Sequence, residues 1–289
     1  MGIEEAIKDI YGSSVSITGK RPVYGGDIND SSMLTLSDGR KVFLKENHGK
    51  GSDFFAAEAA GLRSIDATGT VDAAHVIAHG GDYLLLEYIE TGSKSTSFWE
   101  TFGRKLAAMH KADTSAFVSV GRFGFDTDNY IGASRQFNNA CDTWIDFFRT
   151  MRLEVQFKMA DRYFDDTDRM RISKFLDRLD DLLIEPARPS LLHGDLWGGN
   201  FMVSRDSQPV LIDPAVYVGH AEADIAMTEL FGGFAPVFYD SYKTENPFEP
   251  GYADRRDIYN LYHILNHVNL FGSSYLPGAV RTLRRFAPL

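Results

Sequence analysis

Hydrophobic and polar residues alternate over much of residues 15–90, and this alternation predicts β-strands. The turn Ser37-Asp38-Gly39-Arg40 separates two alternating runs, and an Asp-Gly pair between such runs predicts a β-hairpin. One helix interrupts the strands at residues 53–65, where apolar side chains recur at helical spacing behind Ser52, a residue suited to capping a helix. The predicted strands are residues 31–36, 41–45, 75–78 and 83–89.

The pattern becomes helical after the polar stretch Thr91-Gly92-Ser93, which we interpret as a linker. An island at residues 191–213 interrupts the helices, and its pattern predicts a strand, a glycine-rich polar loop and further strands. We therefore predict an α+β fold with a small, strand-rich N-terminal lobe at residues 1–90 and a larger, helical C-terminal lobe at residues 91–289. The helices predicted in the second lobe are residues 98–110, 140–159, 168–183 and 254–270.

Composition narrows the classes of function. The chain has 289 residues, of which 44% are hydrophobic, so a packed core is expected and intrinsic disorder is excluded. The net charge is −10 and no basic run interrupts it, so we expect no nucleic-acid partner. The single cysteine, Cys141, favours a reducing compartment. We recognise neither a secretory signal nor a stretch that could span a bilayer, and therefore expect a cytoplasmic protein without membrane contact.

The island carries the residues best suited to catalysis. It contains His193-Gly194-Asp195-Leu196-Trp197-Gly198-Gly199-Asn200, and its last strand ends at Asp213. Phosphoryl transfer needs a carboxylate that orients the attacking hydroxyl and accepts its proton, and oxygen ligands that hold Mg²⁺ against the phosphates. The order of Asp195, Asn200 and Asp213 matches the catalytic loop and metal-binding aspartate of a kinase. A lone His-Gly-Asp is usually an ordinary turn, but Asn200 and Asp213 argue against that interpretation.

A kinase also needs a nucleotide-binding lobe, and the strand-rich part has the residues for one. Glycines between strands let backbone N–H groups approach phosphates, and Lys45 on the next strand would reach them. Glu58, on the predicted helix, is its natural partner. Each feature alone has an ordinary alternative, such as a hairpin bend or a solvated surface charge, but their order favours nucleotide binding. The predicted nucleotide contacts are Gly25, Gly26, Asp27, Ile28 and Asn29 in the loop, and Glu87, Tyr88 and Ile89 at the lobe boundary, a strand that would otherwise be plain core.

Three segments together resemble the fructosamine kinase, or ketosamine kinase, family: residues 193–200, residues 212–217 and residues 229–234. The tryptophan in His-Gly-Asp-Leu-Trp and the Phe-Gly-Gly-Phe segment are distinctive of that family, whereas the two aspartates and the asparagine alone also fit aminoglycoside phosphotransferases and choline kinases. The resemblance covers nearly the whole chain. It implies a bilobal, protein-kinase-like fold and an ATP- and magnesium-dependent kinase that phosphorylates the 3-hydroxyl of a ketoamine sugar, so that the adduct becomes unstable and the amine is regenerated.

The resemblance also implies a role for each motif residue. Asp224 resembles an aspartate at a helix start that braces the catalytic loop. Several relatives have a cysteine where this chain has Asp27, so redox control through that loop is not expected here. The other implied roles are Asp195 as the catalytic base, Asn200 and Asp213 as magnesium ligands, Lys45 as the phosphate-binding lysine and Glu58 as its ion-pair partner.

Substrate contacts are predicted only from proximity to these motifs. The indole of Trp197 would pack on the sugar or the amine stem, although a buried core tryptophan is an equal alternative. His263 and His267 have a metal-ligand spacing, but Ile264 stands where a zinc protease has its glutamate, so we predict no zinc site. The candidate substrate contacts are Trp197, Tyr217, His220, His263 and His267.

Two alternative functions stay open at this point. Another small-molecule kinase of the same fold, such as one acting on a polycationic aminoglycoside, would suit the acidic helical lobe. A pseudokinase would bind nucleotide without turnover, but the complete set of kinase residues argues against that role. The sequence is equally compatible with fructosamine, ribulosamine or erythrulosamine as the acceptor, and with a free or a protein-bound amine.

Overall fold

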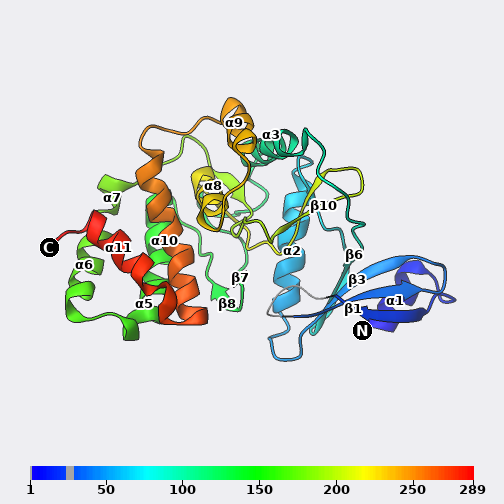
Figure 1. Ribbon diagram of the computed structural model, residues 1–289. Helices are drawn as coiled ribbons and strands as arrows, with labels where there is room; N and C mark the ends of the chain where they lie inside the picture. Colours follow the sequence, from blue (N-terminus) through cyan, green and yellow to red (C-terminus); the bar gives the residue numbers. More distant parts are fainter. Residues whose placement is uncertain (1, 24–28) are drawn as a thin grey trace.

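A computed structural model describes residues 2–23 and 29–289 (Figure 1). The strand-rich part is a five-stranded antiparallel sheet in the order β1-β2-β3-β6-β5. The alternation along β2 and β3 places Leu34, Leu36, Val42 and Leu44 on one face, where they form a core with helix α1. The predicted hairpin is therefore confirmed. The elements are α1 (Ile3–Tyr11), β1 (Ile17–Pro22), β2 (Asp30–Leu36), β3 (Lys41–Glu46), β5 (Val76–His79) and β6 (Tyr83–Glu87).

Helix α2 (Phe54–Ala67) stands between this sheet and the helical part of the molecule (Figure 1). Its buried side chains recur at helical spacing, as the sequence predicts. Gly61 packs against the segment that follows Asp213, because a Cβ atom at Gly61 would lie 3.2 Å from Pro214. The predicted cap is wrong: Asp53, not Ser52, stands at the N-cap position.

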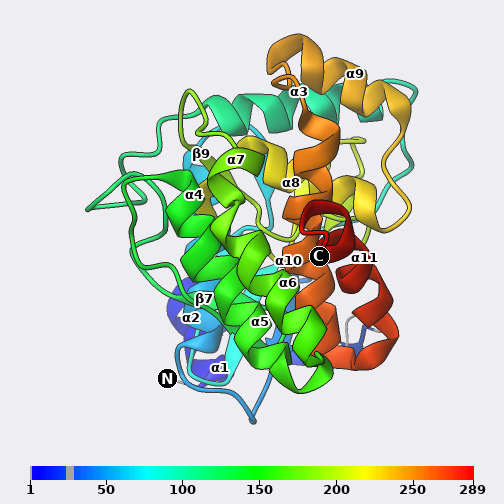
Figure 2. The ribbon, with the colours of Figure 1, turned by 90° about the vertical axis from the view of Figure 1, so that its left-hand side faces the viewer.

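The helical part is built around α10, which packs against α5, α8 and α11 (Figure 2). The predicted helix at 140–159 begins only at Trp144, because residues 140–143 form a loop that ends at the capping side chain of Thr143, and a π-helical turn at Phe148–Leu153 divides it. The predicted helix at 168–183 is interrupted at Arg178. The helices are α3 (Phe98–Lys111), α4 (Trp144–Phe147), α5 (Glu154–Ala160), α6 (Asp166–Asp177), α7 (Leu179–Leu182), α8 (Ala221–Leu230), α9 (Pro236–Glu245), α10 (Tyr252–Phe271) and α11 (Leu276–Phe286).

Short strands within residues 191–213, the island between the helices, pair with neighbouring segments of the chain. Strand β11 pairs with β10 in an antiparallel hairpin and with β4 in parallel, so residues 72–73 join the sheet of the island. The stretch predicted as a linker is held in place, since the Gly92 N–H donates to the Val203 carbonyl at 2.9 Å. The remaining strands are β4 (Asp72–Ala73), β7 (Asn129–Ile131), β8 (Ser134–Gln136), β9 (Ser190–Leu192), β10 (Phe201–Val203), β11 (Pro209–Leu211) and β12 (Tyr217–Gly219).

The described residues include no helix that has both the length and the apolar composition needed to cross a bilayer.

Candidate active site

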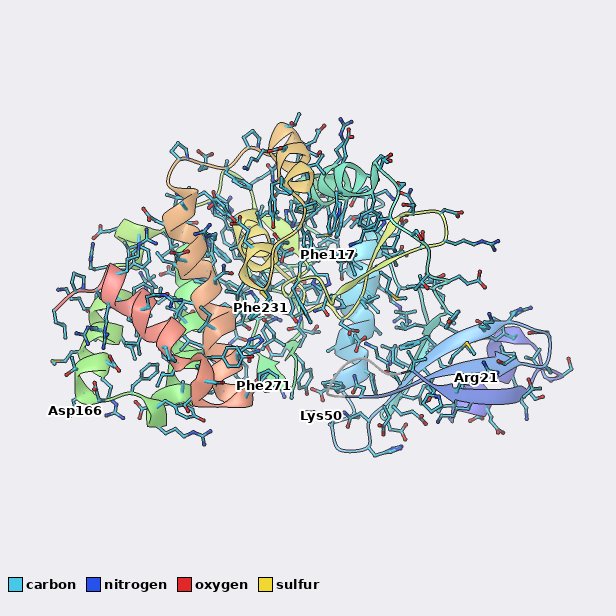
Figure 3. All side chains as sticks on the ribbon, viewed as in Figure 1. Arg21, Lys50, Phe117, Asp166, Phe231 and Phe271 are labelled. Carbon is cyan, nitrogen blue, oxygen red and sulfur yellow. The ribbon has the colours of Figure 1, made fainter. Side chains whose placement is uncertain are left out.

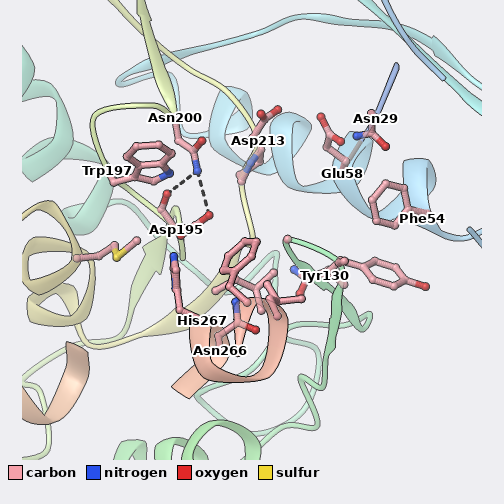
Figure 4. A pocket seen from close by; sticks show the side chains of 18 of the residues that line it. Asn29, Phe54, Glu58, Tyr130, Asp195, Trp197, Asn200, Asp213, Asn266 and His267 are labelled. Carbon is pink, nitrogen blue, oxygen red and sulfur yellow. Dashed lines mark hydrogen bonds between the residues drawn. The ribbon is translucent and has the colours of Figure 1, made fainter. Parts of the chain in front are cut away.

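The loop between β9 and β10 presents Asp195 to the cleft between the sheet and the helices (Figure 4). Asn200 donates from its side-chain amide both to the Asp195 carboxylate (Oδ2, 3.0 Å) and to the Asp195 backbone carbonyl (2.8 Å). Gly194 has a φ of 82°, and a Cβ atom there would lie 2.0 Å from the Ala215 carbonyl oxygen, so only glycine fits. The loop therefore holds the carboxylate of Asp195 in one orientation.

Asp224, on α8, fixes the backbone of this loop from behind. Its buried carboxylate accepts the N–H groups of His193 at 2.6 Å and Gly194 at 2.8 Å. His110 donates to the same carboxylate at 3.2 Å and contacts the Tyr242 hydroxyl through its other ring nitrogen at 2.7 Å. A buried carboxylate is stabilised by such donors, and this arrangement has the geometry expected of a brace.

Lys45 joins the sheet to the island. Its ammonium lies 2.5 Å from Glu58 Oε1 on α2 and also contacts the carboxylate of Asp213. Lys45 is only 7% exposed, and burial alone would lower its pKa, but the charges of Asp213 and Glu58 raise the pKa overall. The ammonium therefore stays charged and bridges two carboxylates that approach from different parts of the fold.

The carboxyl group of Asp195 has a higher pKa than that of an ordinary surface aspartate. Burial is the main cause that raises its pKa to about 7; the hydrogen bond from Asn200 opposes this rise, and the charges of Asp213 and Asp224 contribute to it. A carboxylate poised near neutral pH can accept a proton from a hydroxyl group that hydrogen-bonds to it. The arrangement can therefore support general-base chemistry.

The donors for a metal ion are oxygen atoms. Asp213 directs a carboxylate, 44% exposed, toward the cleft. The bonds of Asn200 to Asp195 use its amide nitrogen, so they leave its carbonyl oxygen available for a metal ion. Within the described ranges, no three His, Cys, Asp or Glu side chains form a metal site by themselves. Mg²⁺ in nucleotide-dependent enzymes takes one or two protein oxygens together with phosphate and water, so Asn200 and Asp213 fit this ion.

A cavity of about 610 Å³ lies in front of Asp195. Its polar end contains the groups just described, and much of the remaining lining is apolar or aromatic. Phe231 and Phe271 are 39% and 57% exposed and lie on the helical side, across from Lys50 (Figure 3). The lining residues include Asn29, Lys45, Phe54, Glu58, Tyr130, Asp195, Trp197, Asn200, Asp213, Phe231, Asn266, His267, Phe271 and Tyr275.

Of the five predicted substrate contacts, Trp197 and His267 line this cavity and three do not. Tyr217 lies on β12, and its ring faces the core, parallel to Trp144 and 4.0 Å from the Arg152 guanidinium. His220 is also buried, where it caps α8 by accepting the Glu222 N–H. Their nearness to Asp213 in sequence was misleading because both side chains point into the core.

His263 also lies outside the cavity lining, although it is near the catalytic loop. It is 4% exposed, and its Nδ1 lies 3.9 Å from Asp195 Oδ1. Burial, together with a smaller effect of nearby His267, lowers the pKa of His263 to about 3, so the ring is neutral. His263 therefore packs beneath Asp195 and does not reach the space where a substrate would bind.

The predicted nucleotide contacts divide into three groups. Residues 25–28 lie outside the described residues, whereas Asn29 lines the cavity and accepts a hydrogen bond from Asn47 at 2.9 Å. The Glu87 N–H is already bonded to the His75 carbonyl, at 2.9 Å. Tyr88 lines a second hollow on the sheet, and Ile89 packs beside the core; neither belongs to the main cavity. Their contact with an adenine ring stays a prediction.

Sequence reasoning missed one part of the cavity wall, the β7–β8 hairpin. Residues 129–133 line the cavity. The strands have three residues each, too short for a reliable alternation pattern. The available signal was Gly132 between two short runs, and its φ of 58° shows that it forms the turn.

Comparison with known proteins identifies relatives over nearly the full length of the chain. A model of the fructosamine kinase family matches residues 1–287. A probable ketoamine kinase of Synechocystis is 42% identical over 98% of this chain and 95% of its own. The chloroplastic protein-ribulosamine 3-kinase of Arabidopsis thaliana is 39% identical over 93% of this chain and 82% of its own.

Solved structures agree with the sequence relatives. A candidate fructosamine-3-kinase of Thermobifida fusca has a TM-score of 0.85 at 29% identity and covers 98% of this chain and 97% of its own. An aminoglycoside phosphotransferase has a TM-score of 0.62 at 16% identity, over 99% of this chain and all of its own, which shows a common fold. The predicted bilobal, protein-kinase-like α+β fold and the family resemblance are confirmed, and the chain is a kinase that belongs to the fructosamine kinase family.

Proposed function

We propose that this protein transfers the γ-phosphoryl group of ATP to the 3-hydroxyl of a ketoamine sugar and so promotes deglycation. The observation that carries the proposal is the position of Asp195: its partly buried carboxylate, held by Asn200, faces the same cavity as the Lys45 and Asp213 pair. Relatives named as ketoamine and protein-ribulosamine kinases support the acceptor class. Structures of the same fold that hold AMP-PNP, ADP or AMP are consistent with the nucleotide.

In the proposed reaction, Asp195 orients the acceptor hydroxyl and receives its proton. Lys45, held by Glu58, binds the phosphates of the nucleotide. Asn200 and Asp213 would hold Mg²⁺, which when bound neutralises charge on the phosphates. In the structure the Lys45 ammonium contacts both Glu58 and Asp213, so it lies beside one of the two proposed metal ligands.

The acceptor would occupy the aromatic part of the cavity. Trp197 and His267 are the predicted contacts that line it, and Phe231 and Phe271 add apolar surface. Aromatic faces pack on sugar C–H groups and attract cations, and the secondary amine of a ketoamine is cationic at neutral pH. This chemistry supports a ketoamine with either a small or an extended amine substituent. The cytoplasm as its compartment remains a prediction from the single cysteine.

The proposal is tested by incubating the purified protein with ATP, Mg²⁺ and one acceptor at a time, and measuring ADP release. The acceptors are a ribulosamine, a fructosamine, an erythrulosamine and an aminoglycoside. Asp195→Asn is the control, and its turnover should fall by at least about 100-fold while nucleotide affinity stays nearly unchanged. Release that requires a ketoamine and is lost in the control supports the proposal. Release only with the aminoglycoside, or nucleotide binding without transfer, would overturn it.

A further inference from the structure

Asp53 stands at the N-cap position of α2, but its side chain does not cap the helix. An aspartate at this position normally accepts an N–H group of the first helical turn. Here both carboxylate oxygens accept the hydroxyl of Tyr130, at 3.0 and 3.1 Å, and Arg135 Nη1 lies 3.8 Å away. The carboxylate is therefore directed toward the β7–β8 hairpin.

Two further contacts join the start of α2 to the same hairpin. The Lys50 ammonium donates to the Ala133 carbonyl at 3.2 Å. The rings of Phe54 and Tyr130 meet edge to face, with centroids 4.8 Å apart. The hairpin thus contacts the start of α2 through the Lys50 ammonium, the Asp53 carboxylate and the ring of Phe54.

The base of the hairpin is fixed to the segment that follows Asp213. Asn129 donates to the Val216 carbonyl at 2.7 Å, and Gln136 donates to the Ala215 carbonyl at 3.0 Å. Both side chains are almost fully buried, and Gln136 also donates to Asn129 at 2.7 Å. Buried amides with all these partners form a rigid support. The hairpin is therefore a fixed reference point against which α2 rests.

Glu58 belongs to α2, five positions after Asp53, and lies 2.5 Å from the Lys45 ammonium. A tilt of the first turns of α2 would therefore move Glu58 away from Lys45. We propose that the β7–β8 hairpin, through the bond between Tyr130 and Asp53, holds α2 in the position that keeps Glu58 against Lys45. Asp53 and Tyr130 act in this way as positioning residues, and the inference rests on the proposed phosphate-binding role of Lys45.

The proposal is tested with Asp53→Ser, Tyr130→Phe and the double variant. Serine can cap a helix but cannot reach the hairpin as the carboxylate does, so the substitution separates capping from contact with Tyr130. Loss of a partly exposed hydrogen bond of this kind should change kcat/KM by about two- to five-fold. We expect kcat/KM for ATP to fall by about this factor in each single variant and no further in the double variant, while KM for the ketoamine is unchanged in Asp53→Ser. Asp66→Ser, an exposed acid on the same helix, is the matched control.

Two measurements show whether the effect passes through Glu58. In a Glu58→Gln background, Asp53→Ser should cause no further loss of kcat/KM for ATP; a full additional loss would overturn the proposal. Amide hydrogen exchange in residues 54–60 should become faster in Tyr130→Phe and not in Asp66→Ser. Because exchange needs no acceptor, it tests the hairpin even if no ketoamine is phosphorylated. Exchange rates equal to those of the unmodified protein would also overturn the proposal.

Discussion

The replacement Asp224→Asn converts one oxygen of a buried carboxylate into an amide nitrogen. In the structure this carboxylate accepts three donors: the N–H groups of His193 and Gly194, and the ring of His110. Asparagine keeps one acceptor oxygen, but its NH₂ group faces a donor in either orientation. At least one buried N–H group then loses its acceptor, and the loop that carries Asp195 loses part of its support.

The size of the effect follows from these bonds. A hydrogen bond to a charged group contributes about 1.5–3 kcal/mol, and an unpaired buried donor costs about 1–3 kcal/mol. We therefore expect Asp224→Asn to lower the free energy of unfolding by about 3–5 kcal/mol. Unfolding entropy is about 2.1 cal/mol/K per residue, or about 0.6 kcal/mol/K for this chain, so Tm should fall by about 5–8 °C.

Thermal unfolding followed by circular dichroism measures this shift directly. Asp181→Asn is the matched control, because Asp181 is an exposed acid on α7 and its replacement should leave Tm unchanged. Turnover should also fall in Asp224→Asn, since the backbone that orients Asp195 is less firmly held. A Tm within about 1 °C of the unmodified protein would refute the reasoning that a charged brace holds this loop.

Three further predictions concern single side chains. Burial lowers the pKa of His220 to about 3, so below pH ~6.5 the unfolded chain binds a proton that the folded protein excludes. The free energy of unfolding therefore falls by about 1.4 kcal/mol for each unit by which the pH is lowered between these two values. His220→Gln should therefore flatten the decline of the urea midpoint from pH 6 to 4, and equal slopes would contradict this. Lys45→Met should reduce kcat/KM for ATP by about 100-fold, and near-normal kinetics would remove its phosphate-binding role. Trp197→Ala should raise KM for the ketoamine about tenfold with MgATP affinity retained, and an unchanged KM would place the acceptor elsewhere.

The core of the site could be predicted because its residues follow one another at fixed spacing. Asp195, Asn200 and Asp213 lie on one loop and the strands beside it, so local structure alone brings them together. Lys45 and Glu58 were predictable from the order of strand and helix. By contrast, the direction of Tyr217 depends on its register with β9, which places its ring in the core beside Trp144. Sequence proximity carries no information about that direction.

The hairpin at residues 129–136 could not be predicted for a different reason. Its strands are too short to show a period, and its contacts with Asp53 and Phe54 join positions far apart in the chain. Such contacts arise only when the two parts of the molecule are packed together. The same limit applies to β4, a strand of two residues that the structure pairs with β11.

The pairing of β4 with β11 has a consequence for how the protein is made. Ala73 lies opposite Leu211 in a parallel ladder, although the two residues are roughly 140 positions apart in sequence. During translation the first ninety residues leave the ribosome long before their partner strand exists. At about 5–20 residues per second, that interval is on the order of 7–30 seconds. The N-terminal sheet region must therefore wait, incomplete, for the strand that precedes Asp213, so an amino-terminal fragment expressed alone should not reach its native state.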